Sequence, residues 1–201
     1  VGGDWTVAAG ATFTSGTNTV TFDGGAAQVI TTGLSAIAAD AGNDFNNVVV
    51  SNTAALVSVA TNLLEIDGTL TINTTAQLDI ADQAMTVTGL FSNAGTGKLL
   101  LDGSQAVTFT AGMDTDSGTV EYNGGGVYTQ LVVGDAYNDL TIGGSGTITL
   151  DAALDVNDDF AISSTQILNT GNLAINVGGD WTVAAGATFT VGTSLVTFDG
   201  A

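Results

Sequence analysis

The sequence predicts an all-β protein and, within that class, a parallel β-helix (β-solenoid). Three observations lead to this prediction. Segments of the chain repeat at several spacings, short stretches alternate apolar residues with Thr, and Gly, Asn and Asp separate these stretches. The chain has 201 residues, of which 44% are hydrophobic, so it has enough apolar material for a continuous core.

The clearest repeat joins the two ends of the chain. Residues 1–24 match residues 177–200 at an offset of 176, and only three positions differ. A weaker repeat relates residues 45–72 to residues 137–162, at offsets of 92 and 90. Self-similarity at unequal spacings indicates stacked units with loops of variable length. We therefore interpret residues 1–201 as a single β-solenoid segment that covers one long period and the start of the next.

The alternation of apolar residues with Thr predicts the strands. A period of two turns one set of side chains inward and leaves Thr outward, and Thr is a good strand former. The pattern is clearest in five short segments: residues 19–22, 69–72, 85–88, 107–110 and 147–150. Turn-forming pairs separate such segments. Examples are Asp23-Gly24, Asp67-Gly68, Asn123-Gly124 and Gly143-Gly144.

No stretch of the chain predicts a helix. The best candidate, residues 36–45, is too short and too rich in Gly and Asp to be more than a turn or loop. The matching stretch before Tyr137 is shorter, so we interpret residues 36–45 as a loop insertion. The chain also has no Pro. Pro would interrupt backbone ladders that continue through every coil, so its absence agrees with a β-helix.

Two other all-β architectures also use short strands. The offsets of 92 and 90 residues are close to the length of an immunoglobulin-like sandwich domain, but no polar linker separates the repeats. Membrane β-barrels need strands of roughly 9–11 residues and aromatic girdles. The strands expected here are shorter, and aromatic residues make up only 6% of the chain. A β-helix coil of three short strands takes roughly 20–25 residues, which predicts about eight to ten coils.

The composition excludes several functions. The chain has 20 acidic residues, one Lys (Lys98) and no Arg, for a formal net charge of −19. Nucleic-acid binding needs Lys and Arg to displace counterions from phosphates, so we expect no nucleic-acid partner. The chain has no Cys and no His, which excludes zinc sites, disulfides, and thiol or imidazole chemistry. No apolar run approaches the roughly 18 residues of a membrane helix, so we expect no membrane insertion by this segment.

Two runs of residues resemble a known class of repeats. Residues 19–30 lead to FNNVVV (45–50), and residues 118–133 lead to YNDLTI (137–142). These runs, like the twice-occurring VGGDWT, resemble the repeats of large bacterial surface proteins of the filamentous-haemagglutinin-like and autotransporter-adhesin class. The resemblance implies a right-handed parallel β-helix, secreted and located outside the cell or on its surface. It also implies the role of a rod, fibre or adhesin stalk.

The acidic residues are the only material for a metal site. In residues 155–159 (DVNDD), oxygen-bearing side chains take the first, third and fifth places of a calcium loop. The sixth place should be Gly and is Phe160, and the twelfth should be Glu and is Gln166. We therefore interpret the stretch as a β-helix corner and predict no metal ligand and no cofactor. Weak Ca²⁺ binding at acidic turns, such as the one that holds Asp114 and Asp116, is the one ion interaction left open.

We expect no enzymatic activity and name no catalytic residue. Some β-helix proteins are polysaccharide lyases or hydrolases, but a lyase needs a cationic residue and only Lys98 is present. Inverting glycosidases need two carboxyl groups about 6.5–9.5 Å apart. A catalytic site requires unique residues, whereas the most distinctive motifs here are duplicated. Glu65 and Glu121 take outward strand positions, where we expect them to face solvent. A carbohydrate-binding or carbohydrate-active β-helix protein is the alternative.

Aromatic and Asn residues recur at matching positions of the repeats. Trp5 and Trp181 could stack on a sugar ring if exposed, but we favour packing in the core or at a corner. Asn46 and Asn138 follow two of the aromatic residues, and aligned Asn side chains at corners can form hydrogen-bonded ladders. We predict stacked aromatic rings in the interior, with matching members Phe22, Tyr122 and Phe198 in one set and Phe45 and Tyr137 in another.

The frequent Thr-x-Thr pairs raise a further alternative. A flat array of Thr side chains on a solenoid can order water, which would make the protein an ice-binding solenoid. The pairs are irregularly spaced along the sequence and do not recur once per coil. We therefore place this function behind the structural one.

Neither end of the chain has a recognisable cap. Natural β-helices cap their ends to prevent edge-to-edge association, but residues 1–3 and 198–201 contain no such pattern. We expect the solenoid to continue end to end, either covalently into further repeats or by docking of subunits, so its first partner is itself. Further expected partners are a host or neighbouring cell surface, or glycans. The chain begins on Val1 with no signal-peptide pattern, which indicates a processed chain or part of a longer polypeptide.

Overall fold

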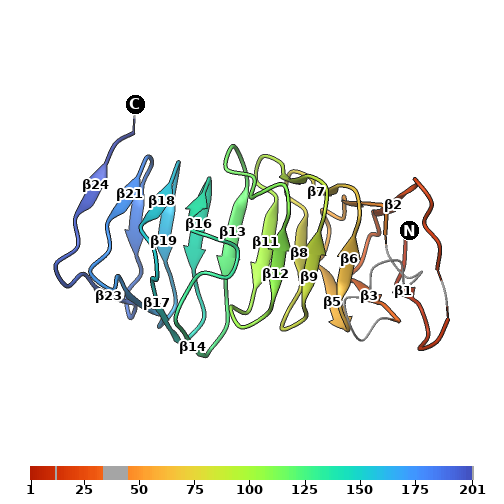
Figure 1. The fold of residues 1–201 in the computed structure, drawn as a ribbon, viewed down its shortest axis with the longest axis horizontal. Helices are drawn as coiled ribbons and strands as arrows, with labels where there is room; N and C mark the ends of the chain where they lie inside the picture. The colour runs from red at the N-terminus through yellow and green to blue at the C-terminus, as the bar shows by residue number, and fades with distance from the viewer. Residues whose placement is uncertain (12, 34–44, 201) are drawn as a thin grey trace. The chain divides into compact units, whose positions relative to one another are not determined.

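A computed structural model describes residues 1–11, 13–33 and 45–200 of the chain (Figure 1). In this part of the chain every regular element is a strand, from β1 to β24, and there is no helix. The strands pair in parallel and wind into a β-solenoid of about nine coils. The predicted fold class and the predicted number of coils are confirmed, and the right-handed sense stays a prediction.

The strands are two to five residues long. In the first half of the chain they are β1 (Trp5–Thr6), β2 (Thr19–Phe22), β3 (Gln28–Thr31), β4 (Asn47–Val50), β5 (Val57–Thr61), β6 (Leu64–Ile66), β7 (Leu70–Ile72), β8 (Gln77–Asp79), β9 (Met85–Val87), β10 (Phe91–Asn93), β11 (Lys98–Leu101) and β12 (Val107–Phe109). In the second half they are β13 (Thr119–Tyr122), β14 (Val127–Tyr128), β15 (Ala136–Tyr137), β16 (Asp139–Ile142), β17 (Thr147–Thr149), β18 (Leu154–Val156), β19 (Phe160–Ile162), β20 (Ile167–Asn169), β21 (Ile175–Val177), β22 (Trp181–Val183), β23 (Thr188–Thr190) and β24 (Val196–Phe198). All five segments with the clearest alternation form strands.

The chain divides into two compact units, and the first comprises residues 1–100 and 105–112. Its strands form three parallel ladders, in the orders β1-β3-β5-β8-β11, β2-β4-β7-β10 and β6-β9-β12. Each strand pairs with the strand one coil further along, as Val48 of β4 pairs with Leu70 of β7 and Leu70 with Phe91 of β10. Each regular coil therefore contributes one strand to each ladder.

The second unit comprises residues 101–104 and 113–201. Its three parallel ladders run β13-β16-β19-β22, β14-β17-β20-β23 and β15-β18-β21-β24. Leu140 pairs with Phe160 twenty residues on, and Phe160 pairs with Trp181 twenty-one residues on. These coil lengths lie at the lower end of the predicted range.

The first coils of the chain are longer than the later ones. Thr19 pairs with Asn47, twenty-eight residues on, whereas Val48 pairs with Leu70, twenty-two residues on. The extra residues lie between β3 and β4, where the sequence predicts a loop insertion at residues 36–45. Residues 36–44 of that prediction lie outside the described part of the chain, and Phe45 forms an isolated parallel bridge with Ile66.

Side chains alternate between the core and the surface as the period of two predicts. Leu70 and Ile72 are fully buried, and Thr71 between them points outward and is half-buried. The same arrangement holds around Thr86 in β9 and Thr141 in β16. Val, Ile, Leu and Phe fill the core, and full burial of one such side chain contributes about 1.5–3 kcal/mol to stability.

Two predictions about exposure are wrong. Glu65 lies between Leu64 and Ile66 in β6, yet all three residues are buried and Glu65 is only 7% exposed. Glu121 is half-buried. Phe198, predicted to lie inside with the other aromatic residues, is 64% exposed. The reason is that β24 pairs with β21 on one edge and ends its ladder.

Candidate functional site

The two copies of the repeated segment, residues 1–24 and 177–200, fold alike. In the first copy the rings of Trp5 and Phe13 meet edge-on, with centroids 4.8 Å apart and planes at 77°. In the second copy the matching rings of Trp181 and Phe189 are 5.0 Å apart at 71°. Both Trp residues are half-buried against aromatic neighbours, so their surroundings favour the predicted packing role over an exposed sugar-stacking role.

The turns of the two copies also agree. Gly10 and Gly186 both have left-handed backbone, with φ of +78° and +98°, a conformation that L side chains rarely adopt. The amide of Ala11 donates to the Ala8 carbonyl at 2.9 Å, and the amide of Ala187 donates to the Ala184 carbonyl at 3.1 Å. The segment therefore makes the same turns at both places, and it differs in that Phe189 lies in β23 whereas the matching Phe13 lies in no strand.

The neighbours of the two copies differ. In the first copy, β1 and β2 pair with β3 and β4, which come later in the chain. In the second copy, β22, β23 and β24 pair with β19, β20 and β21, which come earlier. The first copy therefore has a neighbouring coil on its downstream side, and the second copy has one on its upstream side.

Exposure follows this difference in neighbours. Phe22 in the first copy is fully buried, and the matching Phe198 in the second copy is 64% exposed. At the start of the segment the order reverses, because Val1 is 40% exposed and the matching Val177 is fully buried. We call the half-buried and exposed inward side chains of the second copy the downstream face. This downstream face comprises Trp181, Val183, Phe189, Val196 and Phe198.

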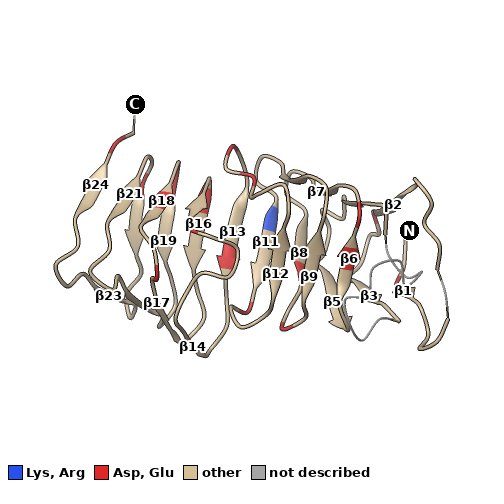
Figure 2. Cartoon of the chain, viewed as in Figure 1, with Lys and Arg blue, Asp and Glu red and all other residues tan. Residues whose placement is uncertain are grey.

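Acidic side chains recur along the solenoid, and the single Lys lies on β11 (Figure 2). Asp139, Asp159 and Asp180 each lie one residue before Leu140, Phe160 and Trp181, which pair across β16, β19 and β22. We call these three acidic residues the carboxylate column. Oδ1 of Asp139 accepts a hydrogen bond from the Asp159 amide at 3.1 Å, and Oδ1 of Asp159 accepts one from the Asp180 amide at 2.8 Å. Asp139 and Asp159 thus each hold the backbone of the next coil.

The carboxylate column has counterparts in the first unit. Oδ1 of Asn47 accepts the Thr69 amide at 2.9 Å, and Oδ1 of Asp4 accepts the Val29 amide at 2.9 Å. The Asn46 side chain therefore does not take part in the predicted ladder of aligned Asn side chains, because the side-chain bond to the next coil is made by Asn47 and goes to a backbone amide. Asn46 Oδ1 instead accepts from the Asn47 side chain at 2.9 Å.

Burial raises the pKa of the Asp139 carboxyl. The hydrogen bond from the Asp159 amide opposes this rise, and the negative charges of Asp158 and Asp159 add to it. A raised pKa means that ionising Asp139 costs the folded state free energy, and the hydrogen bond from the Asp159 amide offsets part of that cost. The column is suited to holding coils together.

Residues 157–159 form the corner between β18 and β19, and the first two residues of the predicted corner, Asp155 and Val156, belong to β18. Phe160 is fully buried in the core, and the Asn157 amide group donates to the Thr115 carbonyl at 2.8 Å. Gln166 is fully buried, and its Oε1 accepts the Gly146 amide at 2.8 Å. The sixth and twelfth places of a calcium loop are thus taken by side chains of the core, while Asp155, Asn157 and Asp159 are exposed.

The second acidic turn is closed by a local bond. Oδ1 of Asp114 accepts the Asp116 amide at 3.0 Å. Within the described ranges, no three Asp or Glu side chains gather closely enough to hold a metal ion. The question of weak Ca²⁺ binding stays open.

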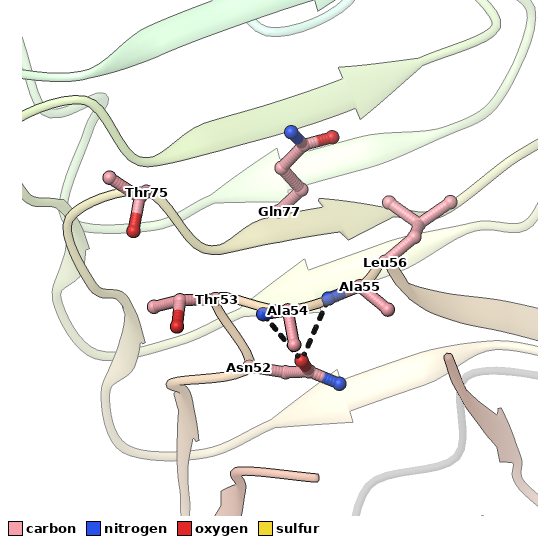
Figure 3. Close-up of a pocket in the computed structure, with 7 residues that line it drawn as sticks. All are labelled: Asn52, Thr53, Ala54, Ala55, Leu56, Thr75 and Gln77. Carbon is pink, nitrogen blue, oxygen red and sulfur yellow. Dashed lines mark hydrogen bonds between the residues drawn. The ribbon is translucent and has the colours of Figure 1, made fainter. Parts of the chain in front are cut away.

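A small surface pocket lies over the corner that follows β4, and sequence reasoning did not indicate it. Its volume is about 110 Å³, room for a few water molecules. Oδ1 of Asn52 accepts the amides of Ala54 and Ala55 at 3.1 and 3.0 Å, so this amide oxygen closes its own turn (Figure 3). The lining residues are Asn52, Thr53, Ala54, Ala55, Leu56, Thr75 and Gln77.

The Thr-x-Thr pairs do not form a continuous array on the ladder β14-β17-β20-β23. Thr147 and Thr149 lie on β17, and Thr188 and Thr190 lie on β23. The intervening strand β20 has Ile and Asn at the matching positions. This interruption gives the ice-binding alternative no support.

Comparisons with protein-family models, with curated proteins and with solved structures found no match. The β-solenoid thus rests on the strands and ladders themselves, and the resemblance to bacterial surface repeats stays a prediction. A search of the described residues for a helix that could span a membrane found none.

Proposed function

We propose that this chain is a structural repeat module of a secreted bacterial surface fibre or adhesin stalk. The module continues end to end into further repeats or subunits. One observation carries the proposal: the repeated segment makes the same turns and aromatic contacts at two places, and the two copies are uncovered on opposite sides. A unit of this kind can be stacked repeatedly with the same contacts each time.

The stacking itself supports a mechanical role. Within each unit, the regular coils are held to one another by three parallel ladders, so stability accumulates from contacts between neighbouring coils. The runs that resemble bacterial surface repeats lie in this framework. Residues 19–22 and 119–122 form β2 and β13, and residues 47–50 and 139–142 form β4 and β16.

The charge supports an exposed location. At a net charge of −19, neighbouring modules repel each other within the Debye length of about 8 Å at physiological salt. A fibre of such modules would stay dispersed while its ends associate. Its proposed partners are further copies of itself, with host or neighbouring cell surfaces or glycans contacted elsewhere along the fibre.

Immunolabelling tests the proposed location and form. Antibodies raised against residues 1–201 are applied to intact and to lysed cells of the source, with a cytosolic protein as the control antigen. We expect labelling of intact cells, loss of the label after protease treatment of the surface, and labelled filaments in material sheared from the cells. Antigen that is reached only after lysis would overturn the proposal.

A further inference from the structure

The downstream face of residues 177–200 is built to receive a further coil. We propose that its occupant is a second copy of this chain, whose residues 25–33 and 45–50 cover the face, joined in tandem so that residues 177–200 of one copy act as residues 1–24 of the next. The inference rests on the proposed function and adds to it the identity and the register of the joint. It follows from the neighbours that the first copy already has.

The contacts of Phe22 show what covers the downstream face. Phe22 pairs with Val50 across the β2–β4 ladder, and its ring meets that of Phe45 edge-on at 6.3 Å. These contacts bury Phe22 completely. Phe198 stands in the same VTFDG context and lacks this cover. Residues 45–50 of a second copy would bury Phe198 as they bury Phe22.

The contacts of Asp4 and Trp5 set the register of the joint. Trp5 pairs with Ile30, and Oδ1 of Asp4 accepts the Val29 amide at 2.9 Å. Asp180 and Trp181 repeat these two residues, and Asp180 is exposed. The carboxylate column, which already joins Asp139 to Asp159 and Asp159 to Asp180, would continue by one step to the Val29 amide of the next copy.

The upstream contacts of the second copy do not compete with this docking. A strand inside a sheet pairs along both edges, as β19 does between β16 and β22. In the second copy β22 uses the edge toward β19, and in the first copy β1 uses the edge toward β3. The two sets of contacts therefore complete one strand.

The test uses a tandem chain in which residue 200 is followed by residues 25–201. The protein has no Cys, so a single introduced thiol reports accessibility through its rate of reaction with a maleimide. Phe198→Cys is the probe. Val177→Cys is the buried reference, since Val177 is fully buried and pairs with Phe198. Thr197→Cys is the outward reference.

In the single chain we expect the Phe198→Cys thiol to react rapidly. In the tandem chain we expect it to react at least ~100-fold more slowly, because a buried thiol reacts only when the structure opens locally. The Thr197→Cys thiol should react equally in both chains. Val50→Asp in the appended copy should restore the reactivity of the Phe198→Cys thiol.

A reactive Phe198→Cys thiol beside a protected Val177→Cys thiol in the tandem chain overturns the inference. A reactive Val177→Cys thiol overturns it too, because a coil that docks correctly leaves the coil beneath it intact. Failure of this joint and failure of the proposed function give different results. Protection in the tandem chain without filaments on cells would refute only the surface fibre, and filaments without protection would refute only this joint.

Discussion

Two pairs of aromatic residues occupy matching positions in the two halves of the chain and serve the fold differently. Phe22 and Phe45 match Tyr122 and Tyr137 in the sequence, and all four are buried. The Phe rings meet edge-on at 6.3 Å. The Tyr hydroxyl groups hydrogen-bond to each other at 3.0 Å. The first pair is an apolar contact, and the second adds a polar network inside the same scaffold.

The network of the Tyr pair anchors the segment between β14 and β15. The Tyr137 hydroxyl donates to the Gly134 carbonyl at 2.6 Å. The Tyr122 hydroxyl accepts the Val133 amide at 3.4 Å. Two buried hydroxyl groups can therefore hold a long connection between strands by hydrogen-bonding to its backbone amide and carbonyl groups from the core side. The comparison teaches that a change from Phe to Tyr at a core position can add the hydrogen bonds that fix a connecting segment.

The largest effect expected in this comparison comes from removing a whole ring. Tyr137→Ala should lower the free energy of unfolding by about 4 kcal/mol, because it leaves a cavity in the core and removes the partner of the Tyr122 hydroxyl. Urea denaturation of residues 1–201, followed by circular dichroism, measures the loss. Phe45→Ala is the matched control for a ring without a hydroxyl. A loss below that of Phe45→Ala would contradict a role for the hydroxyl network.

Alkaline pH should have the next largest effect, because it should lower stability through the Tyr pair and not through the Phe pair. Burial raises the pKa of both Tyr122 and Tyr137 above the ordinary value, and for Tyr137 the neighbouring Tyr122 raises it further. Above about pH 10 the unfolded chain loses these protons while the folded chain retains them. Stability should therefore be complete below pH 10 and fall as the pH rises, by roughly 3 kcal/mol at pH 11 for the two groups together.

Denaturation at pH 8 and at pH 11 measures this loss of stability. The variant with both Tyr122→Phe and Tyr137→Phe should retain most of its stability at pH 11. The third tyrosine, Tyr128, also has a pKa raised by burial but lies closer to the surface. An equal loss at pH 11 in the wild type and in the double variant would show that the buried pair does not cause the pH dependence.

The four-residue strands around the Tyr pair could be predicted from the sequence, and the hydrogen bonds of the two Tyr hydroxyl groups could not. In residues 119–122 and 139–142 the alternation of side chains is enough to give β13 and β16. The two-residue strands β14 and β15 are too short to show a period of two. Whether two Tyr hydroxyl groups meet depends on which coils stack, and that information is spread over residues far apart in the sequence.

The candidate site was predicted only in part for the same reason. Repetition of VGGDWT marked both copies of the segment, but the exposure of Phe198 depends on the missing neighbour of β24. We expected a ladder of aligned Asn side chains at Asn46 and Asn138, whereas the side chains that bond to the next coil are Asn47 and Asp139, and their partners are backbone amides. Alternation assigns a side chain to the inside or the outside, and it does not say what covers the outside, so Glu65 was misplaced.

Removing a single hydroxyl group should have a smaller effect than raising the pH. Tyr137→Phe should cost about 2 kcal/mol, because the Gly134 carbonyl and the Tyr122 hydroxyl lose their partner in a buried place. The variant with both Tyr122→Phe and Tyr137→Phe should cost less than the sum of the two single changes. Urea denaturation of the four proteins completes the double-mutant cycle, and strict additivity would contradict a coupled network.

The same chemical change at the third tyrosine should give the smallest effect. The Tyr128 hydroxyl donates to Oδ2 of Asp102 at 3.0 Å and accepts the Gly126 amide at 3.0 Å, but the side chain is only half-buried. Water can replace a hydroxyl group at such a place, so Tyr128→Phe should cost about 0.5–1 kcal/mol. Thermal unfolding beside Tyr137→Phe measures the difference. A cost equal to that of Tyr137→Phe would mean that burial does not distinguish these hydroxyl groups, and the contrast between an apolar pair and a buried polar pair would lose its physical basis.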